Sequence, residues 1–390
     1  MVSNIQHLVC SACGTLYPHD QLQSVCKQPN CDSTLFATYD LPQNKDFGFG
    51  YSTHNNSMWK FIAYLPVKNP ANIISLGEGL TPVIKMHNLA LQFPENEIWI
   101  KDESANPTGS FKARGISAAA SKAKELGITD LAVPTAGNAG GALAAYAARG
   151  GIRAHIFMPK ATPQAFKDEC RLFGADVTEI NGNISECGKI CHEYAIKNNW
   201  FELSTLKEPY RLEGKKTMGY EILEQFKNNM PDIILYPTGG GTGLIGIWKA
   251  FHELKQLGWL SGEFPKMVSV QSESCKSIVT AFHNQLSDAI YQDLGFTIAN
   301  GLRVPKSYAS SIILDILRIS KGNAVSVSDT EMEAALKEIA AKEGLLIAPE
   351  GAALWVAFKK LHEQNWIKPA ERILLLNTGG AYKYFENIQI

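Results

Sequence analysis

The chain has 390 residues, and its 37 Lys and Arg nearly balance 38 Asp and Glu, for a formal net charge of −1. This balance argues against general nucleic-acid binding and against binding to a membrane surface. The start, MVSNIQHLVCSACG, has neither a basic n-region nor a long apolar stretch, so it predicts neither a signal peptide nor a membrane span. We therefore expect a cytoplasmic protein with about two core domains of ~150 residues plus a small extra element.

Four of the eight cysteines lie in the first 31 residues: Cys10, Cys13, Cys26 and Cys31. In a reducing compartment, paired cysteines on two knuckles usually hold tetrahedral zinc and do not form disulfides. The second pair, CKQPNC, is wider than the usual CxxC, so a metal-free ribbon is the alternative. In either case a ribbon over residues 1–40 is too short to bury a core unaided, and we expect a structural role.

The middle and end of the chain alternate apolar strands with helices. The run LPQNKDFGFGYSTHNNSMWKF predicts a linker that leads into an aromatic helix. From Ile98 onward, strand–helix alternation is typical of an α/β fold with a parallel sheet and right-handed crossovers. The predicted strands are IWIKDE, TDLAVPT, RAHIFMP, ADVTEIN, DIILYPT, MVSVQSE and ERILLLN.

Lys112 is the first candidate for chemistry. It follows the turn formers of KDESANPTGSFKARG, residues 101–115, so it is predicted at the start of a helix. Apolar neighbours there could strip water from its amine, and an amine that is neutral near pH 7 can form a Schiff base. The alternative is an ordinary surface lysine at a helix start.

A glycine-rich turn follows the predicted strand Ile233–Tyr236. In TGGGTG, residues 238–243, a strand, a glycine turn and a helix start come in succession, which is the arrangement that surrounds a phosphate with backbone N–H groups. The segment lacks the lysine of a Walker A loop and does not match GxGxxG, so it favours a phosphomonoester over a nucleotide. A tight turn that needs glycine for its backbone is the alternative.

Two further turns supply polar groups after predicted strands. In PTAGNAGGALAAYAARGG, residues 134–151, Asn138 offers a donor and an acceptor where strand meets helix, although it could also serve as a helix cap. The predicted helix ends at Gly150 and Gly151. In LLLNTGG, residues 374–380, Thr378 either closes a turn or presents its hydroxyl to a heterocyclic nitrogen.

In this order, the motifs resemble those of the tryptophan synthase β-like (fold type II) enzymes that use pyridoxal 5′-phosphate. The resemblance spans about Ser75 to Tyr384. It implies two parallel-sheet domains, with Lys112 holding the cofactor and Asn138 contacting its 3′-oxygen. It also implies that Gly239, Gly240, Gly241, Thr242 and Gly243 bind the cofactor phosphate and that Thr378 faces the pyridine nitrogen.

Within that superfamily the chain is most similar to the threonine synthase family. The similar stretches are SLGEGLTPV, DESANPTGSFKARG, EPYRLEGKKTMGYEI and APEGAAL. The chain departs from the family pattern at Ala113, where SFKDRG is common, at the Thr135–Gly140 loop, which has fewer hydroxyls, and at Glu208–Pro209. By the resemblance, Ser110, Thr135 and Arg211 contact substrate, and Arg211 binds its phosphate. A surface salt bridge between Arg211 and Glu208 or Glu213 is the alternative.

The resemblance also implies domain limits and a reaction. Residues 111–215 would form a small mobile domain inserted in a large one made of 41–110 and 216–390, with the site in the cleft between them. The expected reaction converts O-phosphohomoserine and water to threonine and phosphate, and homodimers are usual in the family. The alternatives are serine or threonine dehydration, a cysteate-synthase-like replacement on O-phosphoserine, and a non-catalytic protein that binds a ligand.

Overall fold

The computed structural model describes residues 2–42, 56–227, 229–293 and 295–388. Most of the predicted linker falls on residues 43–55, outside the described residues. The aromatic residues that follow it form a 3-10 helix, η1 (Met58–Tyr64), which the Ser57 side chain caps by accepting a hydrogen bond from the Trp59 N–H.

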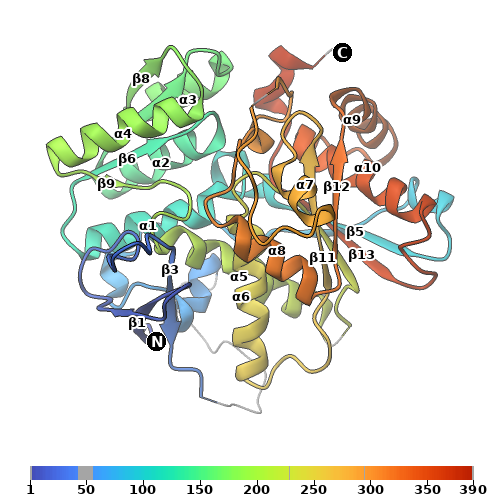
Figure 1. The fold of residues 1–390 in the computed structure, drawn as a ribbon, viewed down its shortest axis with the longest axis horizontal. Coiled ribbons are helices and arrows are strands. Elements are labelled where there is room, and N and C mark those ends of the chain that lie inside the picture. The colour runs from blue at the N-terminus through green and yellow to red at the C-terminus, as the bar shows by residue number, and fades with distance from the viewer. Residues whose placement is uncertain (1, 43–55, 228, 294, 389–390) are drawn as a thin grey trace.

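The N-terminal residues form a small antiparallel sheet (blue in Figure 1). Its strand order is β2 (Leu16–Tyr17), β1 (Ile5–Cys10), β3 (Leu35–Tyr39). Alternate residues of β3 point inward, with Leu35 and Ala37 fully buried. The sheet carries all four N-terminal cysteines on or beside its strands, as the predicted ribbon requires.

A six-stranded sheet forms the larger core. Its strands are parallel except β4, which pairs antiparallel with β5 at the edge. The central strands read IILYP and LLLN and are buried on both faces, as expected for a sheet covered by helices. The order is β12 (Asn323–Val327), β11 (Lys266–Ser272), β10 (Ile233–Pro237), β13 (Arg372–Asn377), β5 (Glu97–Asp102), β4 (Val83–Lys85).

A second, four-stranded sheet is parallel throughout. It lies within residues 130–202, inside the predicted small domain. All seven predicted strands are confirmed across the two sheets, whereas β4, β9 and β12 were not predicted. The order is β8 (Asp176–Ile180), β7 (Arg153–Pro159), β6 (Asp130–Pro134), β9 (Phe201–Glu202).

Helices connect the strands and cover both sheets. Helix α2 ends at Gly150, and Gly151 follows with φ 68°, as predicted. Helix α10 packs on β10 to β13, while α5 packs against both α1 and α6. The α-helices of the described residues are α1 (Lys112–Glu125), α2 (Asn138–Gly150), α3 (Gln164–Leu172), α4 (Ile184–Asn198), α5 (Tyr210–Phe226), α6 (Thr242–Gln256), α7 (Ser277–His283), α8 (Ser310–Ile319), α9 (Asp329–Glu343) and α10 (Pro349–Glu363).

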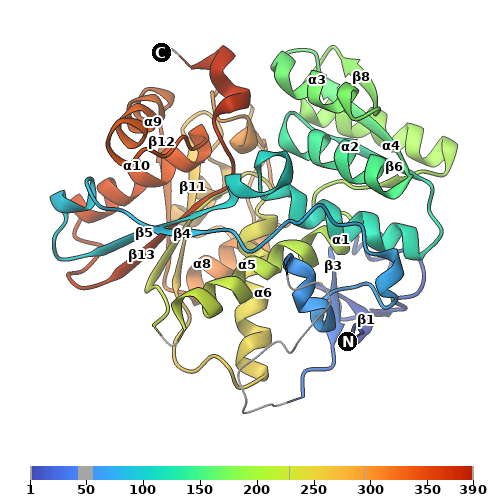
Figure 2. The ribbon, with the colours of Figure 1, turned by 180° about the vertical axis from the view of Figure 1, so that it is seen from behind.

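Two lobes result, and the expected α/β fold with an N-terminal cysteine ribbon is confirmed. Figures 1 and 2 show the four-stranded sheet with its helices on one side and the six-stranded sheet on the other, with the ribbon beside α1. The C-terminal segment lies at the edge where the two lobes adjoin in both views. Among the described residues, no helix is long and apolar enough to cross a membrane.

Candidate active site

The carboxyl ends of the parallel strands bring the predicted motifs to one place. Asn377 pairs with Asp102 at the ends of β13 and β5, and β10 ends beside them at Pro237. Ligands of open α/β sheets bind at this edge, and a cavity of about 750 Å³ opens there. Its lining includes Lys112, Thr135, Asn138, Arg211, Gly239, Gly240, Gly241, Thr242 and Thr378. Ser110 and Gly243 do not line the cavity, but their chain neighbours Phe111 and Thr242 do.

Lys112 is the first residue of α1, as the sequence predicted. Its Nζ lies 4.5 Å from the centroid of the Phe111 ring. The surrounding protein desolvates the ammonium, and Arg211 adds repulsion, so the pKa of Lys112 falls to about 8. An appreciable fraction of the amine is therefore neutral near physiological pH, which is the form that attacks an aldehyde.

Two glycines bring Arg211 close to Lys112. A Cβ on Gly115 of α1 would lie 2.7 Å from the Arg211 carbonyl oxygen, and a Cβ on Gly214 of α5 would lie 2.0 Å from the Arg114 carbonyl oxygen. Only glycine allows the N-terminal turns of α1 and α5 to approach this closely. The approach explains the glycines in KARG and RLEG and places both basic residues on one cavity.

Arg211 is 2% exposed, so the surface salt bridge considered from the sequence is wrong. Its guanidinium donates to the Leu203 carbonyl, while its Nε has no hydrogen-bond partner. Glu208 instead accepts hydrogen bonds from backbone N–H groups at the start of α5, including that of Arg211 at 3.0 Å. No described carboxylate lies within ion-pair distance of Arg211, so its charge is available to a ligand.

The glycine turn before α6 is shaped by close contacts. A Cβ on Gly239 would lie 2.1 Å from the Gly301 carbonyl oxygen, and one on Gly240 would lie 2.7 Å from a Thr205 methyl. Gly241 has φ +75° and precedes the helix without any side-chain cap. The N–H groups of the first turn have no partner within the helix; that of Gly243 binds the Tyr236 hydroxyl, and Thr242 lines the cavity, so this helix end suits a phosphate.

The remaining predicted residues occupy the cavity wall at the ends of β6 and β13. Asn138 begins α2, and its side chain contacts Lys383 and Tyr384, so it is not the helix cap considered from the sequence. The Thr135 hydroxyl accepts from the Gly137 N–H at 3.1 Å. The Thr378 carbonyl accepts from the Phe111 N–H at 3.1 Å, which ties the two turns together, and Ser110 and Gly379 form a bridge beside them.

A buried ion network fixes α1 against the sheet and α5. Arg114 donates to Glu103 at 2.6 Å and to Glu221 at 2.5 Å, and Lys101 donates to Glu221 at 2.9 Å. All four side chains are at most 1% exposed. Removing one partner from such a network strands a buried charge. The network therefore holds the helix that presents Lys112.

Comparison with known proteins identifies the fold family. Residues 74–379 match the family described as pyridoxal-phosphate dependent enzyme. The chain belongs to this family. Similar curated relatives include the threonine synthase of Methanocaldococcus jannaschii, 33% identical over 377 residues that cover 96% of this chain and 92% of the relative. The threonine synthase of Methanosarcina acetivorans is 32% identical over 378 residues, covering 97% and 92%.

Solved structures agree on the fold. The processed form of threonine deaminase isoform 2 from Solanum lycopersicum superposes with a TM-score of 0.67 at 22% identity, covering 78% of this chain and 86% of that one. The serine racemase of maize gives a TM-score of 0.66 at 21% identity, covering 77% and 88%. At these identities the likeness shows the fold alone. The fold and the family resemblance inferred from the sequence are therefore confirmed.

The cavity fits pyridoxal 5′-phosphate, the cofactor of the family. Several buried polar atoms around it lack a partner within the protein, including Ser110 Oγ, Arg211 Nε and Glu350 Oε2. Buried polar groups are normally hydrogen-bonded, so these atoms point to a bound molecule. The groups that an aldehyde with a phosphate needs lie together on this cavity. Lys112 has a lowered pKa, the glycine turn precedes a helix N-terminus, and Asn138 provides an amide.

Sequence reasoning missed several residues of the cavity, among them Lys215, Arg303 and Glu350. Burial, followed by repulsion from Arg211 and Lys112, lowers the pKa of Lys215 well below its usual range. Burial raises the pKa of Glu350, whose Oε1 accepts from the Gly301 N–H at 2.7 Å. Lys215 and Glu350 lie in EPYRLEGKK and APEGAAL, so the family-like stretches already contained the signal.

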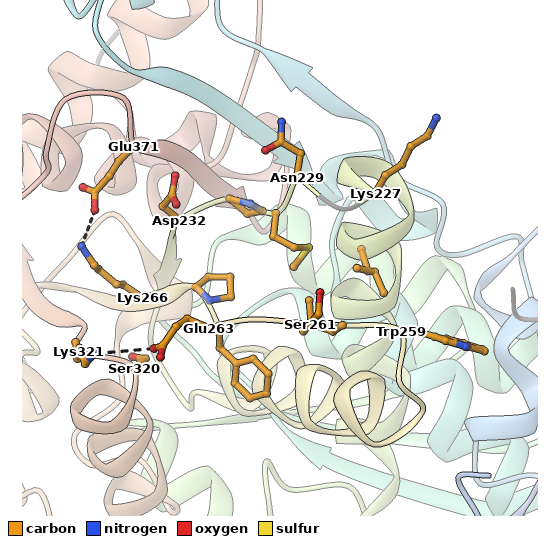
Figure 3. A pocket seen from close by; sticks show the side chains of 16 residues that line it. Lys227, Asn229, Asp232, Trp259, Ser261, Glu263, Lys266, Ser320, Lys321 and Glu371 are labelled. Atoms are coloured by element: carbon orange, nitrogen blue, oxygen red, sulfur yellow. Dashed lines mark hydrogen bonds and ion pairs between the residues drawn. The ribbon is translucent and has the colours of Figure 1, made fainter. Parts of the chain in front are cut away.

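A second, smaller hollow lies at the amino ends of β10 and β11 (Figure 3). Its volume is about 430 Å³. Two ion pairs lie along its wall, Lys266 with Glu371 at 2.6 Å and Lys321 with Glu263 at 3.9 Å. These charges compensate one another, and none of the predicted site residues lines this hollow. We therefore place the active site in the larger cavity.

The four N-terminal cysteines form one cluster. Their sulfur atoms all lie within 4.8 Å of one another, and none is in a disulfide. The Cys10–Cys31 and Cys13–Cys26 sulfur atoms are 3.5 Å apart. Tetrahedral zinc with Zn–S bonds of about 2.3 Å places sulfur atoms about 3.8 Å apart. The donors and spacing therefore suit one zinc ion. Cys187 and Cys191 are fully buried thiols of the core.

Proposed function

We propose that this chain is a threonine synthase, which converts O-phosphohomoserine and water to threonine and phosphate. One observation carries the proposal: basic side chains far outnumber acidic ones along the cavity. Its lining includes a single carboxylate, Glu350, together with Lys112, Lys189, Lys207, Arg211, Lys215, Arg303 and Lys306. Such a cavity favours a substrate that bears a phosphate dianion in addition to its carboxylate.

The basic residues without an ion pair support a phosphate site most strongly. Arg211, Lys215 and Arg303 have no ion pair with any described carboxylate, whereas Lys306 pairs with Asp288 at 2.6 Å. Burying the unpaired Arg211 charge is costly, and a phosphate group would compensate that charge and oppose the lowering of the Lys215 pKa. The name shared by the similar relatives, threonine synthase, agrees with this substrate.

The proposed residue roles follow from their positions. Bound pyridoxal phosphate supplies an electron sink for carbanion chemistry at the substrate. Lys112, with its pKa near 8, would hold the cofactor and then accept and return protons at the substrate carbons. Thr378 would present a hydroxyl and no carboxylate to the ring nitrogen of the cofactor, which would leave that nitrogen largely unprotonated and would suit elimination and replacement. Arg211 would bind the substrate phosphate, with Ser110 and Thr135 beside it.

The alternative functions differ in whether the substrate carries a phosphate group. A serine or threonine dehydratase has no substrate phosphate and would leave Arg211, Lys215 and Arg303 uncompensated. A cysteate-synthase-like enzyme acting on O-phosphoserine would use the same cations. A non-catalytic binding protein would have no need for a lysine amine of lowered pKa beside the glycine turn.

The remaining parts of the proposal concern the metal site, the movement of the small domain, the oligomeric state and the cellular location. The cluster of Cys10, Cys13, Cys26 and Cys31 would hold one structural zinc with no open position. Residues 111–215 would move as the small domain when the cleft closes on substrate. We further propose a cytoplasmic homodimer.

Release of inorganic phosphate from a panel of amino acids tests the proposed function. O-phosphohomoserine should give the highest kcat/KM, with O-phosphoserine well below it. Efficient formation of 2-oxobutyrate from threonine without phosphate release from O-phosphohomoserine would replace the proposal with a dehydratase. An absence of turnover on every member, with bound cofactor present, would favour the binding protein.

A further inference from the structure

The C-terminal 3-10 helix η7 (Tyr382–Asn387) bridges the two lobes beside the cavity. Lys383 Nζ lies 2.7 Å from both carboxylate oxygens of Glu169 on α3 and 2.8 Å from the Thr108 carbonyl oxygen. The Tyr384 ring packs edge-on against Phe166 of α3 with centroids 5.5 Å apart. The segment therefore joins the small lobe to the turn before Lys112.

The same two residues hold the amide of Asn138. Lys383 Nζ lies 3.3 Å from Asn138 Oδ1, and Asn138 Nδ2 lies 3.4 Å from Tyr384 Oη. An ammonium group can only donate hydrogen bonds, so Oδ1 must be the atom that faces Lys383. Nδ2 consequently faces Tyr384, and its second N–H remains free for the cavity.

Tyr384 is itself held in a donor role. Its hydroxyl donates to Glu350 Oε1 at 3.0 Å, so its oxygen can accept from Asn138 Nδ2. Both side chains are buried, at 2% and 4% exposure, and both line the cavity. A chain of hydrogen bonds thus runs from Glu350 through Tyr384 to Asn138.

Helix α2 has a glycine beside Glu169, the carboxylate that binds Lys383. A Cβ on Gly141 would lie 1.9 Å from Glu169 Oε2. A side chain at this position, one turn beyond Asn138, would displace the carboxylate from its place beside α2. The GNAGG segment therefore serves two purposes, because it presents the amide and admits the acid that orients Lys383.

We propose that Lys383 and Tyr384 are positioning residues that lock the Asn138 amide with its donor nitrogen turned toward the cofactor. The inference rests on the proposed place of Asn138 beside the cofactor's 3′-oxygen. A donor at that oxygen favours its anionic form, which gives the bound cofactor its visible absorption band. Loss of the lock lets the amide turn, and absorbance moves from the visible band to the near-ultraviolet band.

The test measures two quantities in holoenzyme variants. One is the band ratio, which is the visible absorbance divided by the near-ultraviolet absorbance, and the other is the dissociation constant of the cofactor. Lys383→Met alone would leave Glu169 unpaired, so the decisive variant is the double change Lys383→Met with Glu169→Gln. It should lower the band ratio and weaken cofactor binding about three- to tenfold, the effect of one hydrogen bond. Tyr384→Phe, which keeps the ring on Phe166, should act in the same direction.

Matched variants separate positioning from general stability. Lys383→Arg should keep the wild-type ratio, as should Glu169→Gln alone, because the amide oxygen of glutamine can still accept a hydrogen bond from Lys383. Lys359→Met, which breaks a lysine–glutamate pair between α10 and α9, should keep the ratio as well. Wild-type ratio and affinity in the double variant would overturn the inference. If Asn138→Ala also keeps the ratio, the place of Asn138 is wrong as well. Failure of O-phosphohomoserine turnover with normal bands would defeat only the proposed function.

Discussion

Replacing Arg211 by Ala should impair substrate use and leave cofactor binding intact. The guanidinium is buried, one of its nitrogens is engaged by the Leu203 carbonyl, and Nε is free to face a ligand. A hydrogen bond to a charged group contributes ~1.5 to 3 kcal/mol. At 1.4 kcal/mol per factor of ten, loss of one such bond lowers kcat/KM for O-phosphohomoserine roughly ten- to a hundredfold, and loss of a bidentate contact lowers it more.

Continuous measurement of phosphate release gives kcat/KM for the variant, and the visible spectrum reports its cofactor. Arg211→Lys keeps the charge but loses the planar fork, so it should recover only part of the activity. Arg318→Ala on α8 is the control for loss of an arginine away from the cavity, and thermal unfolding checks that each variant is folded. A kcat/KM for Arg211→Ala within twofold of the wild-type value would refute the phosphate-binding role.

Three further predictions address the cofactor, its pH dependence and the metal. Borohydride reduction followed by peptide mapping should place the pyridoxyl group on Lys112, and a label on another lysine would refute the assignment. Because the pKa of Lys112 is lowered to about 8, its neutral fraction falls about tenfold for each pH unit below that value. Cofactor capture by the apoenzyme should therefore accelerate with pH and level off above about 8; a rate that keeps rising to pH 10 would contradict the lowered pKa. Metal analysis should find about one zinc per chain, and Cys10→Ser should lower Tm more than kcat, whereas metal-free protein with the same Tm would exclude the site.

The sequence was sufficient to predict most of the central strands because they are continuous apolar runs. IILYP and LLLN are buried on both faces, and such runs are recognisable without knowledge of their neighbours. Strand β12, NAVSV, has polar residues at its first and fourth positions, which interrupt the apolar run, and β4 and β9 have only three and two residues. Their pairing depends on strands far away in the chain, which local patterns do not encode.

The candidate site could be predicted from the sequence where its residues lie in a short turn motif. Lys112 and the glycine turn are local features, and the structure places both on one cavity. Glu350 reads in the sequence as an ordinary acid in the first turn of a helix. Its burial and its contact with Tyr384 arise only from packing. Lys383 contacts Asn138 from 245 residues away, so no local signal could reveal it.

Turnover of O-phosphohomoserine in water enriched in ¹⁸O tests the central claim most directly. A threonine synthase breaks the bond between Cγ and the phosphate oxygen and forms a new bond between Cβ and a water oxygen. Mass spectrometry should therefore find one threonine per phosphate, with the label in the threonine hydroxyl and none in the phosphate. Labelled phosphate accompanied by homoserine, or 2-oxobutyrate in place of threonine, would contradict the account.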